Sequence, residues 1–127
     1  VLIDPRARFL TAERFPDTQL DDRWPDDAIR ALAPDARTAI VTLSHDPKID
    51  DPALLAALET PAAYIAALGS KSSQIKRKER LIAMGASTDQ LARIEGPAGV
   101  AINAISAPEI ALSIAGGMVR AFNDGLR

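Results

Sequence analysis

The chain has 127 residues, of which 47% are hydrophobic and 25% are charged, the composition of one ordinary globular domain. It contains no cysteine, which excludes disulfides and thiolate chemistry and fits a cytoplasmic protein. A single histidine excludes a metal site built from several histidines. The net charge of −2 argues against a nucleic-acid-binding protein, and no apolar run reaches the roughly 20 residues of a membrane helix.

The first residues, Val1–Asp4, have the pattern of a short buried strand that ends in an acid. In dinucleotide-binding folds the second strand ends in an acid that lies near a ribose hydroxyl, so Asp4 is a candidate ligand contact. The first strand of such a fold would then precede Val1. The other interpretation, that Asp4 only caps the segment after it, stays open. Because the sequence opens on a strand and without methionine, we predict one domain, residues 1–127, from a longer protein.

Strand and helix patterns alternate along the rest of the chain. In chain order we expect a helix over 6–15, an edge strand over 18–20, a helix over 25–33, a strand over 38–43, a helix over 50–58, a strand over 63–68, a helix over 73–84, a helix from 87 to 94, a strand over 100–102 and a helix over 106–122. This alternation predicts an α/β fold with a mostly parallel sheet and right-handed crossovers.

Two polar loops follow the two clearest strands. Ser44–Lys48 comes after strand 38–43, and Gly69–Ser73 comes after strand 63–68. The carboxyl ends of parallel strands meet at one edge of the sheet, where ligands bind in open α/β folds. The candidate binding residues in the loops are Ser44, His45, Asp46, Lys48, Gly69, Ser70 and Lys71. Their amine, imidazole and hydroxyl groups, beside a helix start, suit an anion such as a phosphate, although neither loop matches a P-loop or G-x-G-x-x-G.

Other polar residues have interpretations without a ligand. His45 next to Asp46 has the composition of a catalytic base with its orienting acid, but adjacent residues rarely point the same way, so we favour a hydrogen-bonding role. The basic run 76–80 has the pattern of a solvated helix face. Asp50 and Asp51 precede Pro52, which indicates a helix start rather than a metal pair. Gly116–Gly117 weakens the last helix by up to about 1 kcal/mol per glycine and predicts a close packing contact, or alternatively a dimer interface.

The assembled motifs resemble the Rossmann domain of the XdhC/CoxI family, the accessory proteins of xanthine dehydrogenase and related molybdenum hydroxylases. The stretches that carry the resemblance are 42–54, 64–70, 76–77, 80–81, 93–99 and 107–111, with His-Asp-Pro-Lys at 45–48 and Ala-Leu-Gly-Ser at 67–70 as the most specific blocks. The sequence departs from the family's usual residues at Ala66, Lys71–Ser73, Gln74, Glu95 and Asn103. Most of these positions fall on the predicted ligand edge.

The resemblance implies a Rossmann-like three-layer fold that lacks its first strand here. It implies that the domain binds molybdenum cofactor (molybdopterin), with Gly96 added to the binding residues. The implied role is that of a chaperone, not an enzyme in its own right. Such proteins hold the cofactor during sulfuration by a cysteine desulfurase and deliver it to a xanthine dehydrogenase-like hydroxylase, and they are cytoplasmic and often homodimers. An NAD(P)-binding domain of an oxidoreductase, supported by Asp4, and a scaffold or dimerisation domain remain alternatives.

Overall fold

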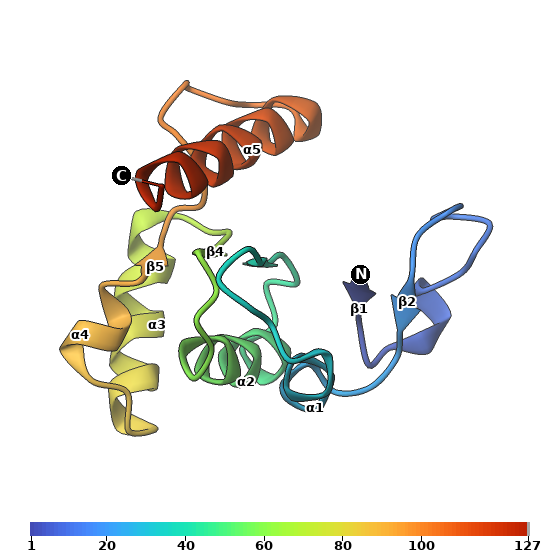
Figure 1. The fold of residues 1–127 in the computed structure, drawn as a ribbon, viewed down its shortest axis with the longest axis horizontal. Coiled ribbons are helices and arrows are strands. Elements are labelled where there is room, and N and C mark those ends of the chain that lie inside the picture. The colour runs from blue at the N-terminus through green and yellow to red at the C-terminus, as the bar shows by residue number, and fades with distance from the viewer. Residues whose placement is uncertain (127) are drawn as a thin grey trace.

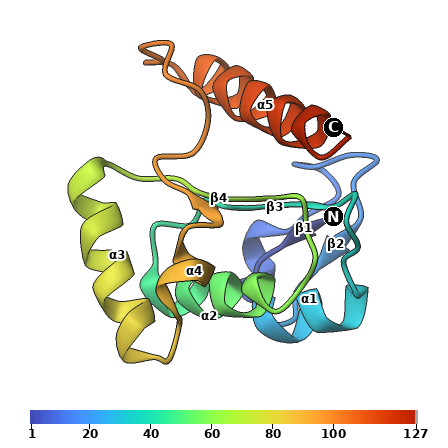
Figure 2. The same ribbon diagram turned by 60° about the vertical axis from the view of Figure 1, so that its left-hand side comes forward.

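The computed structural model describes residues 1–126 as two β-sheets, each built of parallel strands, with helices on both faces (Figure 1). Its elements are β1 (Leu2–Ile3), the 3₁₀ helix η1 (Ala7–Phe9), β2 (Leu20–Asp21), α1 (Pro25–Leu32), β3 (Ala39–Thr42), α2 (Pro47–Leu58), β4 (Tyr64–Ala67), α3 (Lys71–Ala83), α4 (Thr88–Leu91), β5 (Ile94–Glu95) and α5 (Ala107–Asp124). Helices α1 and α2 cover one face of the strands and α5 covers the other (Figure 2). This arrangement confirms the predicted three-layer α/β fold. Within the described residues, no helix combines the length and the apolar character needed to cross a membrane.

Strand β4 is the centre of the larger sheet. It pairs in parallel with β3 on one side and with β5 on the other, and all four of its residues are buried. Its Ile65 packs with Leu54 of α2 and Leu81 of α3 in the main hydrophobic core. The strands predicted over 38–43 and 63–68 are therefore confirmed, because an apolar, turn-bounded run fits a strand that is covered on both faces.

Two helices begin earlier than predicted. The side chain of Asp46 accepts a hydrogen bond from the backbone N–H of Lys48, which makes Asp46 the N-cap of α2 and puts Pro47 at the first helical position. Ser70 caps α3 by accepting from the N–H of Ser73, so that α3 starts at Lys71. These starts place both polar loops directly on helix N-termini.

Two predicted elements are wrong. Only a 3₁₀ turn and a further turn form over 6–15, because the Thr11 hydroxyl accepts from the N–H of Arg14 and competes with helix formation in a segment too short to be stable alone. The last strand is Ile94–Glu95, not 100–102. Val100 instead donates its backbone N–H to Ser113 of α5 at 3.0 Å, which directs this stretch away from the sheet.

The glycine pair in α5 is a packing contact, as one of the two interpretations predicted. A Cβ atom at Gly117 would lie 2.6 Å from the Tyr64 hydroxyl, and one at Gly116 would lie 3.2 Å from Val100. Gly117 faces the sheet and is buried. An intermolecular interface through Gly117 is therefore wrong, because its face of α5 is already occupied by β4.

Candidate functional site

The candidate site lies at the carboxyl edge of β3 and β4. The two strands are parallel, and Leu68 donates its N–H to the carbonyl of Thr42 at 3.0 Å, so their following loops open on the same side. The sequence predicted this meeting of the loops 44–48 and 69–73, and the fold confirms it. An edge of this kind is where open α/β sheets bind ligands.

The loop after β3 is held by its own polar side chains. Ser44 donates its hydroxyl to the buried carboxylate of Asp50 at 2.6 Å and accepts from the backbone N–H of Asp46 at 3.1 Å. Ser44, Asp46 and Asp50 therefore shape the loop and cap α2. His45 and Lys48 are exposed and, within residues 1–126, their side chains make no hydrogen bond or ion pair. Their charged and imidazole groups face solvent, where a ligand can reach them.

The turn after β4 has the properties of an anion site. Gly69 adopts a φ of 138°, a conformation that glycine tolerates far better than other residues. Ser70 caps the 13-residue helix α3, and Lys71, at its first position, is exposed. The first N–H groups of a helix lack intrahelical partners and form its positive end. Backbone donors and one lysine amine are thus available to an anion at this turn.

Beneath this turn lies a buried guanidinium that sequence reasoning missed. Arg77 is only 6% exposed, and its side chain donates to the Gln74 side chain at 2.8 Å and to the carbonyl of Leu68 at 3.4 Å. Among the residues that the structure describes, its Nε has no hydrogen-bond partner. Within residues 1–126 it forms no ion pair. A buried positive charge without an acid raises the electrostatic potential under the turn, which favours an anion above it.

The third part of the edge is the loop that follows β5. Gly96 packs against the Gln74 side chain so tightly that a methyl group there would overlap it. Gln74 in turn donates to the carbonyl of Ala67 at 2.9 Å, and Ala98 donates its backbone N–H to the same carbonyl at 3.1 Å. Gly96 is thereby brought to the β4–α3 turn, as expected if it belongs to one site with Gly69.

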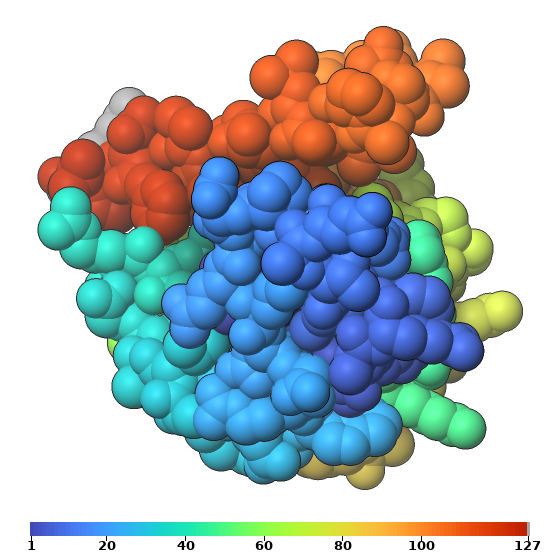
Figure 3. Space-filling view, turned by 90° about the vertical axis from the view of Figure 1, so that its right-hand side faces the viewer, coloured from blue at the N-terminus to red at the C-terminus, as the bar shows by residue number. Residues whose placement is uncertain are grey.

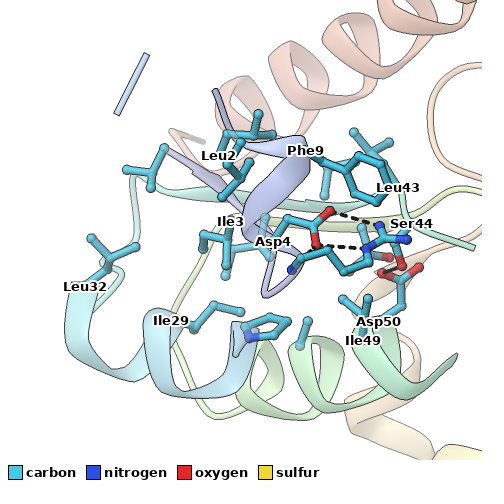
Figure 4. Close-up of a pocket in the computed structure, with 18 of the residues that line it drawn as sticks. Leu2, Ile3, Asp4, Phe9, Ile29, Leu32, Leu43, Ser44, Ile49 and Asp50 are labelled. Atoms are coloured by element: carbon cyan, nitrogen blue, oxygen red, sulfur yellow. Dashed lines mark hydrogen bonds and ion pairs between the residues drawn. The ribbon is translucent and has the colours of Figure 1, made fainter. Parts of the chain in front are cut away.

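Asp4 lies apart from this turn. It lines a groove of about 600 Å³ together with Ser44, and its carboxylate accepts two side-chain hydrogen bonds from Arg6 at 3.0 and 2.9 Å (Figure 4). These hydrogen bonds hold the pKa of Asp4 below its usual value, and Arg6 also lies close enough to Asp46 and Asp50 to feel their charges. A ribose hydroxyl at Asp4 would compete with Arg6. No group of three metal-ligating side chains occurs in the described part of the chain.

Fold and site together define a parallel α/β domain of the Rossmann type with an anion-suited carboxyl edge. The family model described as the XdhC Rossmann domain matches residues 1–118 of the sequence, and the chain belongs to this family. It is 33% identical over 98 residues to the molybdenum cofactor insertion chaperone PaoD of Escherichia coli (strain K12), covering 77% of this chain and 30% of that protein.

A solved structure described as a xanthine dehydrogenase from Bacillus halodurans has a similar fold. It superposes with a TM-score of 0.76 at 26% identity and covers 96% of this chain and 34% of that one. The chain thus spans about a third of the length of both relatives.

Proposed function

We propose that this domain binds molybdenum cofactor and serves as part of an accessory protein that matures the cofactor and inserts it into a molybdenum hydroxylase. The observation that carries the proposal is the similarity over 98 residues to a protein named as a molybdenum cofactor insertion chaperone. The anion-suited edge supports it, because the molybdopterin part of the cofactor carries a phosphate.

The residues of the β4–α3 turn would hold that phosphate. Gly69 leaves room for close backbone approach, the N–H groups after Ser70 point at the ligand, and Lys71 supplies a mobile charge. Arg77 supports the turn from below and adds a fixed charge. The loop after β3, with His45 and Lys48, would contact another part of the cofactor. All of these groups bind and orient, and none is assigned a chemical step.

The proposed role also fixes the expected partners. A xanthine dehydrogenase-like hydroxylase would receive the cofactor, and a cysteine desulfurase would supply sulfur to it while bound. We extend the proposal to a homodimer in the cytoplasm that is not itself an enzyme. An NAD(P)-linked oxidoreductase is the competing class, and the engagement of Asp4 by Arg6 reduces its support.

The test is titration of the full-length protein with molybdenum cofactor. Lys71→Ala should weaken binding about tenfold or more, since a hydrogen bond to a charged group contributes roughly 1.5–3 kcal/mol. Lys78→Ala is the matched control, because Lys78 is an exposed lysine of the same helix beyond its first turn. The affinity of this variant for molybdenum cofactor should stay within about twofold of the wild-type value. The cofactor affinity of His45→Ala tests the contribution of the loop after β3.

Each outcome has a clear meaning. Unchanged affinity in both Lys71→Ala and His45→Ala removes the site assignment. Tight binding of NADPH or NADH with no binding of molybdenum cofactor overturns the proposed function and supports the competing class.

A further inference from the structure

The lysines of the chain are gathered in one region. Three of the four, Lys71, Lys76 and Lys78, lie on α3, and the fourth, Lys48, lies at the start of α2 within the candidate site. All four are exposed, and within residues 1–126 none of them forms an ion pair. Five arginines, in contrast, are paired with acids of the same chain. The lysine charge therefore remains available to a partner.

Helix α3 is the basic pole of an acidic chain. It holds five of the 15 basic residues and one of the 17 acidic residues, whereas residues 1–60 hold 12 of the acidic ones. In the space-filling view, side chains of α3, in yellow-green, project at the right-hand rim beyond the face formed by residues 1–24 (Figure 3). A local excess of positive charge attracts partners of opposite charge and speeds their association.

One row of side chains on α3 alternates lysine with isoleucine. At helical spacing it consists of Lys71, Ile75, Lys78 and Ile82. All four are exposed, and the two isoleucines are 61% and 56% exposed. We call Ile75, Lys78 and Ile82 the α3 stripe, because Lys71 already belongs to the candidate site. Figure 2 shows α3 at the margin of the molecule, where this row can be reached.

The fold itself makes no use of the α3 stripe. Helix α3 enters the hydrophobic core through Leu81, and neither Ile75 nor Ile82 belongs to a core cluster. Single exposed apolar residues are normal on a protein surface. Two isoleucines aligned on either side of a lysine, with Lys76 nearby, are a different arrangement, because apolar side chains bordered by charged ones are typical of protein–protein contacts.

The mixture of side chains selects the class of partner. A helix that lies on a membrane needs a broad apolar face with bulky residues such as Trp, Phe or Leu, and the α3 stripe has only two isoleucines with a lysine between them. A nucleic acid would contact the lysines through its phosphates and leave the isoleucines without an apolar partner. A protein surface that combines carboxylates with apolar side chains complements both.

We propose that the α3 stripe is a docking surface for a protein with an acidic, partly apolar patch, and that this partner is the acceptor of the ligand held at the β4–α3 turn. This inference rests on the proposed function, in which the acceptor is a molybdenum hydroxylase. A helix rises about 1.5 Å per residue, so Ile82 lies about 16 Å from Lys71 along the axis of α3. A partner seated on the stripe therefore borders the candidate site.

Titration of the full-length protein with the apo form of its molybdenum hydroxylase tests the charged part. Lys78→Glu should weaken the complex at least about tenfold at low salt, because an attractive contact becomes a repulsive one. Arg37→Glu is the matched control with the same net charge: Arg37 is exposed, lies outside α3 and forms no ion pair in the described part of the chain. Its affinity should stay within about twofold of wild type, and added salt should reduce the difference between the variants.

The apolar part has a test of its own. Ile82→Ser should weaken the same complex about tenfold, because the partner loses an apolar contact that salt does not screen. Leu112→Ser is the control, since Leu112 is an equally exposed apolar residue on α5, and its affinity should stay within about twofold of wild type. The α3 substitutions change exposed side chains, so the unfolding midpoint of each variant should shift little.

Three results overturn the proposal. A wild-type protein that does not bind the apo-hydroxylase, or equal binding by Lys78→Glu and Arg37→Glu, removes the docking surface. Binding to vesicles of phosphatidylcholine and phosphatidylserine that is lost in Lys78→Glu, without binding to the hydroxylase, assigns the stripe to a membrane. A change in the oligomeric state of Lys78→Glu alone, measured by light scattering, assigns it to a second copy of the chain.

Cofactor affinity separates this proposal from the proposed function. Lys78 lies beyond the first turn of α3, so Lys78→Glu should keep its affinity for molybdenum cofactor within about threefold of wild type. Normal cofactor binding with unchanged hydroxylase binding in Lys78→Glu overturns the docking surface and leaves the function standing. A wild-type protein that binds no cofactor overturns the function, and a hydroxylase complex that still depends on Lys78 and Ile82 then keeps the docking surface.

Discussion

The side-chain amide of Gln74 donates a hydrogen bond to the carbonyl of Ala67 at 2.9 Å and so ties α3 to the last residue of β4. The oxygen of the same amide accepts from Arg77 at 2.8 Å. One buried side chain thereby satisfies a strand carbonyl and a buried guanidinium directly beneath the candidate site. The geometry of the β4–α3 turn therefore depends on Gln74 as well as on the residues of the turn.

Replacing that amide should be costly. In Gln74→Leu, the Ala67 carbonyl and the Arg77 guanidinium both lose a buried partner, and we expect the free energy of unfolding to fall by about 2–4 kcal/mol in denaturant titrations. Gln19→Leu is the control, because Gln19 is exposed and its change should stay within about 0.5 kcal/mol. Equal effects of the two substitutions would show that Gln74 does not support the turn.

Gly96 should not accept a side chain. The methyl group of Gly96→Ala would overlap Gln74, and overpacking of this kind costs about 1–3 kcal/mol of unfolding free energy. Gly125→Ala is the matched control, since Gly125 has a helical φ of −68° and its nearest neighbours would be 3.5 Å from the new atom. If Gly96→Ala unfolds at the same denaturant concentration as wild type, the contact between the β5 loop and α3 is loose.

Local chemistry is enough to predict much of the fold. A capping box of Ser87 and Gln90 begins α4, where the sequence predicts a helix start at 87, and the apolar run at 63–68 forms the central strand. Such signals depend on neighbours in sequence, so they survive without knowledge of the fold. The error at 6–15 shows the limit of such signals, because the segment is too short to be stable alone as a helix and the Thr11 hydroxyl competes for the backbone.

The parts of the site that depend on long-range contacts were not predictable. The pattern of the basic run 76–80 predicts a solvated face, and Lys76 and Lys78 are exposed, but Arg77 between them is buried. Gln74, Arg77 and Leu81 share one face of α3 at helical spacing. Because two of the three residues are polar, hydropathy alone cannot distinguish this buried helix face from a solvent-exposed one.

Tyr64 should resist ionisation until the protein unfolds. Burial, aided by its hydrogen bond to Glu95, raises the pKa of Tyr64 well above the usual value of about 10. At pH values below the usual pKa of about 10, the phenol is neutral in both the folded and the unfolded protein, so the stability that it contributes is fully present. Above it the unfolded chain releases the proton first, so the free energy of unfolding declines as pH rises toward the folded pKa.

The single tyrosine of the chain makes this measurable. The ultraviolet band of tyrosinate should appear together with loss of helical circular dichroism, not before it. In Tyr64→Phe the tyrosine-dependent part of the alkaline decline should vanish. A tyrosinate band in the folded protein near pH 10 would contradict the burial of this phenol.

The ion pair between α2 and α3 should matter more than surface pairs. Arg80 bonds Asp51 at 2.7 and 3.2 Å, and the carboxylate is only 6% exposed. Arg80→Met leaves that buried carboxylate unpaired, and we expect the free energy of unfolding to fall by about 1–3 kcal/mol in denaturant titrations. Arg30→Met, which breaks the exposed pair with Asp26 at 3.5 Å, should cost about 1 kcal/mol or less.

A second substitution separates charge burial from lost packing. Adding Asp51→Leu to Arg80→Met removes the unpaired carboxylate, so the double variant should regain part of the stability lost by Arg80→Met alone. If it is instead less stable than the single variant, the loss comes from the packing of the arginine stem across α2 and α3 rather than from the buried charge.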